Sequence, residues 1–116
     1  MQWLRRWFAK PADPSPAADL TEIRRSFEES AADEEHFPST IDPRIYHVQV
    51  VTQHLGSVRS VLDVGSGKGR FARIVKERQP AARVVCFDLA LAMLRAVDAN
   101  LLACAGSMTQ LPFRDS

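Results

Sequence analysis

The chain has 116 residues, of which 46% are hydrophobic and 25% are charged, and its formal net charge is +1. These values are those of an ordinary folded chain of one domain at most, with a small core. They give no electrostatic case for nucleic acid as a general partner. No apolar run approaches the roughly 18 residues of a membrane span, and the first residues lack the long apolar centre of a signal peptide.

Residues 1–10 form a short basic amphipathic segment whose apolar side chains recur at helical spacing, namely Trp3, Leu4, Trp7 and Phe8. One interpretation is a helix that makes weak contact with a membrane surface or binds a partner. The other, which we favour, is a helix that covers the apolar side of the domain, or a frayed end. Three prolines in residues 11–18 predict an extended linker, so the segment is tethered to the rest of the chain rather than fused to it.

Residues 19–56 are expected to form N-terminal helices. Asp19 and Glu22 have the spacing of a capping pair, and the apolar stripe behind them predicts a helix from about Leu20 to Ala31. The cluster from Asp33 to His36 comes next on a solvated stretch, where adjacent side chains seldom converge on one ion. We therefore predict no metal site there.

A second helix is expected to begin at Asp42 and Pro43, a cap followed by the residue best tolerated in a first turn, and to stop at Gly56. Tyr46 and His47 lie at the edge of its apolar stripe. We expect both to be exposed, with Tyr46 as the nearest candidate for contact with an acceptor.

The stretch SVLDVGSGKGRF, residues 60–71, organises the rest of the chain. An apolar run from Val61 to Val64 leads into three alternate glycines, from Gly65 to Gly69, and then into a helical pattern from Arg70 to Glu77. Glycine permits the backbone angles of such a turn and lets a ligand approach the main chain. The free N–H groups at a helix start attract negative charge, so an anionic or strongly polar ligand is expected here.

Strands and helices alternate after this turn. A second strand is predicted over residues 83–87, ending at Asp88, then a helix over about 91–99 and a third strand over 101–105. This order predicts an α/β fold with a parallel sheet in residues 57–116. A ligand of such a sheet lies at the carboxyl ends of its strands.

Both cysteines, Cys86 and Cys104, fall inside predicted strands, and neither has the spacing of a zinc or redox motif. We interpret them as buried thiols in a reducing cytoplasm.

The position of Asp88 indicates the kind of ligand. It lies about 20 positions after the last glycine and ends the second strand, where a carboxylate accepts hydrogen bonds from ribose hydroxyls. An adenosine-containing ligand is therefore expected. A dinucleotide site needs a small residue where Arg70 stands. Asp63 would repel a pyrophosphate but can pair with an ammonium group.

The segments VLDVGSGKGRF, VVCFDLALAML and AGSMTQLPF resemble, in order and spacing, three motifs of class I S-adenosylmethionine-dependent methyltransferases. The resemblance covers about residues 41–116 and implies S-adenosyl-L-methionine as cofactor and a Rossmann-like, doubly wound parallel sheet. It implies these site residues: Asp63, Gly65, Ser66, Gly67 and Gly69 at the methionine moiety, Asp88 at the ribose, and Leu89, Ser107 and Met108 at the adenine.

Two positions depart from the family pattern. Ala90 stands where the family often has a serine cap, which weakens the start of the next helix by about 1 kcal/mol. Ser107 stands where an aspartate commonly takes the adenine amino group. The resemblance also implies a fourth strand beside the first, which would begin where the sequence ends. We therefore expect an incomplete sheet of three strands, in a fragment or in a chain that a second chain completes.

The expected function is methyl transfer to an unidentified acceptor, a small molecule rather than nucleic acid, with this chain as the donor-binding part. Acceptor groups and any base usually come from other segments in this family, so no catalytic residue is named. Two alternatives stay open at this point: a nucleotide-cofactor (NAD-type) oxidoreductase domain, and a non-catalytic partner or membrane-surface module that uses residues 1–10.

Overall fold

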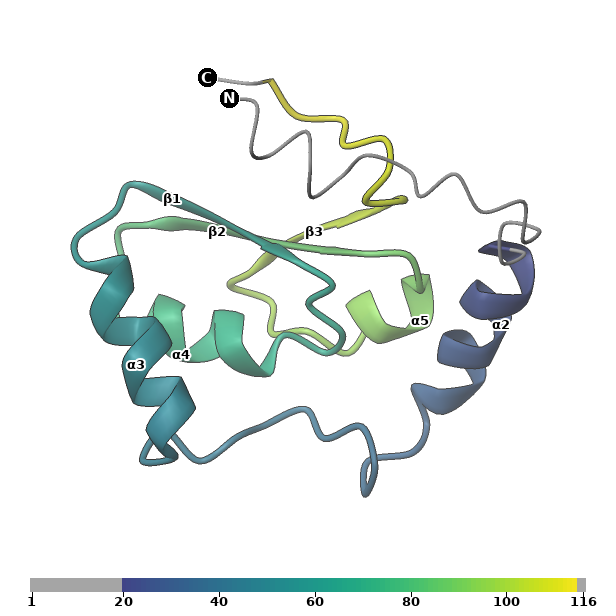
Figure 1. Ribbon diagram of the computed structural model, residues 1–116, viewed down its shortest axis with the longest axis horizontal. Coiled ribbons are helices and arrows are strands. Elements are labelled where there is room, and N and C mark those ends of the chain that lie inside the picture. Colours follow the sequence, from purple (N-terminus) through teal and green to yellow (C-terminus); the bar gives the residue numbers. More distant parts are fainter. Residues whose placement is uncertain (1–19, 115–116) are drawn as a thin grey trace, which may run out of the picture.

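The structure, a computed structural model, describes residues 20–114 (Figure 1). Its elements are α2 (Leu20–Ser30), α3 (Tyr46–Leu55), β1 (Ser60–Val64), α4 (Arg70–Arg78), β2 (Arg83–Asp88), α5 (Leu91–Leu94) and β3 (Leu102–Ala105). The predictions for the amphipathic segment, the proline linker and the Asp19 cap lie outside the described residues. Between residues 20 and 114, no helix has the length and apolar character needed to cross a membrane.

The strands in the described part of the chain form one parallel sheet of three, in the order β1-β2-β3. Val64 of β1 aligns with Phe87 of β2, and Phe87 aligns with Cys104 of β3. Each crossover contains a helix, so the predicted Rossmann-like α/β fold is confirmed. Over the same residues β1 pairs with β2 alone, and a strand along its other edge stays a prediction.

The hydrophobic core lies between the sheet and the helices on one of its sides, where α3, α4 and α5 are seen together (Figure 1). Side chains alternate between the faces of a strand, so Val84 and Cys86 of β2 point to the same side. They pack with Ala72 and Val75 from the inner face of α4, and with Leu101 before β3. This packing fixes α4, and with it the glycine turn, against the sheet.

The opposite face of the sheet is apolar and partly exposed. The exposed fractions are 37% for Leu62, 41% for Val64 and 52% for Leu102. Phe87 on the same face is only 1% exposed. Phe113 packs edge-on against it, with ring centroids 5.8 Å apart. The segment after β3 thus returns over the sheet.

Helix α3 begins at Tyr46, about a turn later than predicted. The Asp42 carboxylate accepts hydrogen bonds from the backbone N–H of Arg44 at 2.9 Å and from its guanidinium at 2.8 Å. This local turn competes with helix capping. The position before the helix is taken by Ile45, with φ −59° and ψ 132°.

Helix α5 is shorter than the predicted 91–99. The N–H groups of Ala96 and Val97 bond to the carbonyls of Met93 and Leu94, three residues back, at 3.1 and 3.2 Å. Such bonds belong to tight turns rather than to α-helix. Only Leu91–Leu94 is α-helical.

Helix α2 has the predicted extent, but its apolar stripe does not enter the core. No residue of α2 is buried, and Leu20 and Phe27 are 50% and 43% exposed. The helix lies beside α5, where the strands end (Figure 1). Glu28 Oε2 accepts the N–H of Ala92 at 3.0 Å. Glu28 therefore caps the start of α5, where Ala90 offers no side-chain cap.

Candidate functional site

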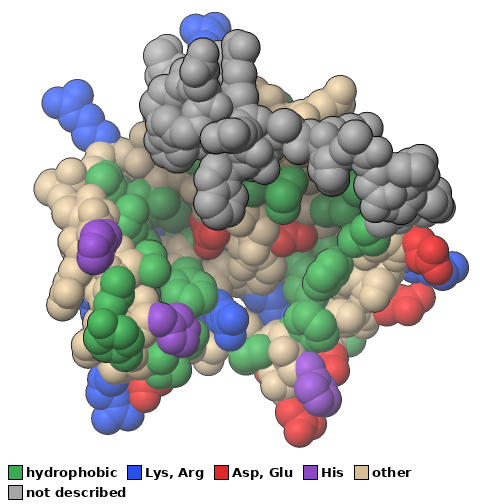
Figure 2. All heavy atoms as spheres, in the orientation of Figure 1, with side chains coloured by type: hydrophobic (Ala, Val, Ile, Leu, Met, Phe, Trp, Pro, Cys, Tyr) green, Lys and Arg blue, Asp and Glu red, His purple; other side chains and the backbone are tan. Residues whose placement is uncertain are grey.

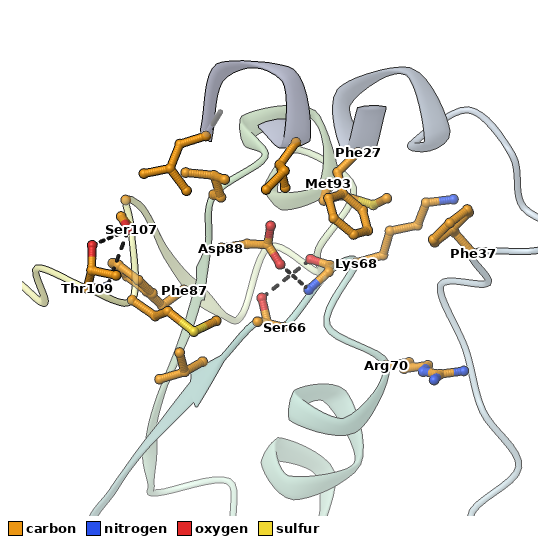
Figure 3. A pocket seen from close by; sticks show the side chains of 18 of the residues that line it. Phe27, Phe37, Ser66, Lys68, Arg70, Phe87, Asp88, Met93, Ser107 and Thr109 are labelled. Atoms are coloured by element: carbon orange, nitrogen blue, oxygen red, sulfur yellow. Dashed lines mark hydrogen bonds between the residues drawn. The ribbon is translucent and has the colours of Figure 1, made fainter. Parts of the chain in front are cut away.

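A cavity of about 560 Å³ opens at the carboxyl ends of the strands. This volume is in the range of small-molecule sites. Most of the predicted site residues line it: Gly65, Ser66 and Gly67 after β1, Asp88 and Leu89 after β2, and Ser107 and Met108 after β3. The opposite wall comes from α2 and the segment behind it (Figure 3).

The glycine turn is fixed to the end of β2. Gly65, Gly67 and Gly69 have φ values of 74°, 56° and 78°, and residues other than glycine rarely adopt such backbone angles. The N–H groups of Gly65 and Ser66 both donate to the carbonyl of Phe87, at 2.8 and 3.1 Å. The turn is thereby held at the mouth of the cavity.

Asp88 connects the three loops that follow β1, β2 and β3. Its Oδ2 accepts the N–H of Gly67 at 2.8 Å, and its Oδ1 accepts the N–H of Ala90 at 2.9 Å. Its backbone carbonyl accepts the N–H of Gly106 at 3.0 Å. Each carboxylate oxygen has a second lone pair that can accept a hydrogen bond from a ligand. In Figure 3 Asp88 lies in the middle of the pocket.

Two predicted site residues, Gly69 and Asp63, are not among the residues that line the cavity. A Cβ on Gly69 would lie 3.1 Å from Val97 Cγ1 and 3.3 Å from Cys86 Sγ, so this glycine serves core packing. Burial, and secondarily the charge of Asp88, raise the pKa of the half-buried Asp63.

The opposite wall of the cavity and the glycine turn that it contacts contain residues that the sequence did not single out. Phe27 and Phe37 meet edge-on with ring centroids 6.2 Å apart. The Lys68 side chain is only 4% exposed, and its Nζ donates to Glu34 Oε2 at 2.8 Å. This bond, with hydrogen bonds from Ser39, lowers the pKa of Glu34 to about 2. The ion pair joins the segment after α2 to the glycine turn.

His36 also lines the cavity, and its Nδ1 lies 2.9 Å from Asp33 Oδ2. Over residues 20–114, no three His, Cys, Asp or Glu side chains are grouped so as to hold a metal ion.

Tyr46 is 80% exposed and does not line the cavity, so the structure does not bring it to the site. Cys86 is fully buried, and burial raises the pKa of its thiol to about 11, which makes it a poor nucleophile. Cys104 is only partly buried, which corrects the expectation of two buried thiols. Both are free cysteines.

The parallel sheet and its crossover helices define an α/β domain of the Rossmann-like type, with a cavity at the carboxyl ends of the strands. Residues 61–116 match the family described as a methyltransferase domain. Malonyl-acyl-carrier protein O-methyltransferase of Geobacter sulfurreducens is 30% identical over an alignment of 105 residues, and the match covers 84% of this chain and 39% of that relative. Both matches confirm the resemblance to class I S-adenosylmethionine-dependent methyltransferases and disfavour the oxidoreductase alternative.

Proposed function

We propose that this chain binds S-adenosylmethionine and is the donor-binding part of an enzyme that methylates a small acceptor. The observation that carries the proposal is the position of Asp88 in the middle of the cavity, with acceptor capacity left on both carboxylate oxygens. The vicinal hydroxyls of a ribose are suitable donors to such a carboxylate. The match of residues 61–116 to a methyltransferase domain supports S-adenosylmethionine as the nucleoside that brings them.

The other cavity residues suit the remaining parts of this donor. Leu89 and Met108 offer apolar side chains at the adenine, beside Ser107. Ser107 Oγ lies 2.7 Å from Thr109 Oγ1, so its hydroxyl already takes part in a local turn. Recognition of the adenine amino group would therefore depend on backbone groups. The turn from Gly65 to Gly67 would contact the methionine moiety.

The reaction needs little covalent chemistry from this chain. When bound, S-adenosylmethionine supplies a methyl group on a sulfonium, which an acceptor attacks in line. The chain's own residues would bind the donor and orient it for that attack. We assign no general base among residues 20–114.

The acceptor is the least defined part of the proposal. The name of the Geobacter relative describes O-methylation of malonyl-acyl-carrier protein. For this chain we propose a small molecule or small acyl group rather than nucleic acid, because the net charge of +1 gives no general attraction to phosphates. A cytoplasmic location belongs to the same proposal, and the two free cysteines are compatible with it. Contact of residues 1–10 with a membrane surface stays a prediction.

Calorimetric titration of S-adenosylhomocysteine tests the proposal. The wild-type chain should bind it, and Asp88→Ala should bind it roughly 10- to 100-fold more weakly, because hydrogen bonds to a charged acceptor are lost. Asp42→Ala removes the same charge from an exposed loop outside the cavity and should leave the affinity unchanged.

Circular dichroism and thermal unfolding must show that each variant is folded, since Asp88 also holds the loops. No saturable binding by the folded wild-type chain, or preferential binding of NADH, would overturn the proposal.

A further inference from the structure

The basic side chains around the cavity differ in what they contact, and this difference suggests a further ligand contact that rests on the proposed function. His36 is paired with Asp33, and the buried Lys68 is paired with Glu34. Arg70 lines the same cavity, but its guanidinium has no ion-pair partner among residues 20–114. Arg70 therefore contributes a positive charge that the described chain does not neutralise.

The position of Arg70 is set by its neighbours. Its guanidinium carbon lies 5.5 Å from the centroid of the Phe71 ring. The centroids of the Phe71 and His47 rings are 6.0 Å apart. Stacking of this kind restrains the planar guanidinium without using its hydrogen-bond donors. In the space-filling view, Lys and Arg side chains lie in the hollow between the α3–α4 side and the α2 side of the molecule (Figure 2).

Arg70 and the predicted adenine residues lie at opposite ends of the pocket. In Figure 3 Ser107 and Thr109 are on one side of Asp88, and Arg70 is on the other. A donor with its adenine near Ser107 and its ribose at Asp88 would extend its methionine part toward Arg70. The carboxylate of that part is the only anionic group of S-adenosylmethionine.

We infer that Arg70 binds a carboxylate at the end of the cavity opposite Ser107. Guanidinium and carboxylate fit each other in bidentate geometry, and the unpaired charge of Arg70 favours an anion. The carboxylate belongs either to the methionine part of the donor or to the acceptor. Arg70 would thus determine specificity for a charged ligand group.

The test compares two ligands in the full chain. S-adenosylhomocysteine carries the carboxylate, whereas S-adenosyl-3-thiopropylamine keeps the adenosine, the thioether and the amine but lacks it. For a donor carboxylate, Arg70→Gln should weaken binding of the first ligand about 10- to 100-fold and leave the second unchanged. Arg70→Lys should lose less affinity for the first ligand than Arg70→Gln does, because lysine keeps the positive charge but not the bidentate guanidinium. Arg83→Gln, an exposed arginine at the start of β2, is the matched control and should change neither affinity.

A second titration detects an acceptor carboxylate. If Arg70→Gln binds both adenosine ligands normally, succinate is titrated into chain saturated with S-adenosylhomocysteine. Binding by wild type that is lost in Arg70→Gln would support the acceptor as the source. The inference is overturned if neither titration depends on Arg70, or if Arg83→Gln has the same effect. Normal binding of the thiopropylamine by Arg70→Gln shows that its fold is intact. Failure of wild type to bind either adenosine ligand would overturn the proposed function, and the Arg70 inference with it.

Discussion

Gly69 and Gly67 both have positive φ, but the space around them differs, and this difference gives a quantitative prediction. A Cβ at Gly67 would have no atom within 4 Å, whereas one at Gly69 would meet Val97 Cγ1 at 3.1 Å, Cys86 Sγ at 3.3 Å and Leu101 Cδ1 at 3.4 Å. The left-handed backbone alone costs an alanine about 1–2 kcal/mol. Crowding in a packed core adds about 1–3 kcal/mol. We therefore expect Gly67→Ala to lose about 1–2 kcal/mol and Gly69→Ala about 2–5 kcal/mol of unfolding free energy.

Urea denaturation followed by far-UV circular dichroism measures the two losses. If the slope of unfolding free energy against urea concentration is the same in both variants, the two values can be compared directly. The loss of affinity for S-adenosylhomocysteine should be larger for Gly67→Ala, the variant that loses less stability. Gly67 lines the cavity and Gly69 does not, so Gly67→Ala should weaken binding more than Gly69→Ala does. Equal destabilisation by the two variants, or weaker binding only in Gly69→Ala, would refute the assignment of Gly69 to core packing.

Two further variants test single contacts. Because the pKa of Asp63 is raised above its usual 3.8, its ionised form is disfavoured in the folded chain, and the stability it contributes falls as pH rises from 3.8 through the folded value. Asp63→Asn should therefore raise the free energy of unfolding at pH 7 and give no gain below pH 3.8; a loss at pH 7 in urea titrations would contradict this sign. Glu28→Ala removes the acceptor of the Ala92 N–H and should cost about 0.5–2 kcal/mol, whereas Glu28→Gln keeps an amide oxygen and should cost less. Equal losses in urea unfolding would show that Glu28 does not act as a cap.

The parts of the fold encoded by short sequence patterns are the ones that the sequence predicts well. The apolar run, the alternate glycines and the helical pattern of residues 60–71 lie together in the chain, and the structure forms a strand, a turn and a helix there. The second strand is predicted over residues 83–87 and observed over Arg83–Asp88. Asp88 lies at the cavity because the ends of adjacent parallel strands meet at one edge.

The opposite wall of the cavity, formed by α2 and the segment behind it, could not be predicted in the same way. Lys68 and Glu34 are 34 positions apart, and Glu28 and Ala92 are 64 positions apart. No local periodicity links such residues, so the partners become visible only when α2 is placed beside α5. The apolar stripe of α2 is a correct signal for a helix. It could not show that Phe27 lines a cavity rather than entering the core.

The bonds of Asp88 also constrain how this site can be redesigned. The proposed ribose contact makes Asp88 the residue to exchange when a different nucleoside preference is wanted. Here that carboxylate also accepts the N–H groups of Gly67 and Ala90, one on each oxygen. An asparagine would keep only one acceptor oxygen, and an alanine none. Asp88 therefore cannot be exchanged on its own, and any substitution would need compensating changes in both loops.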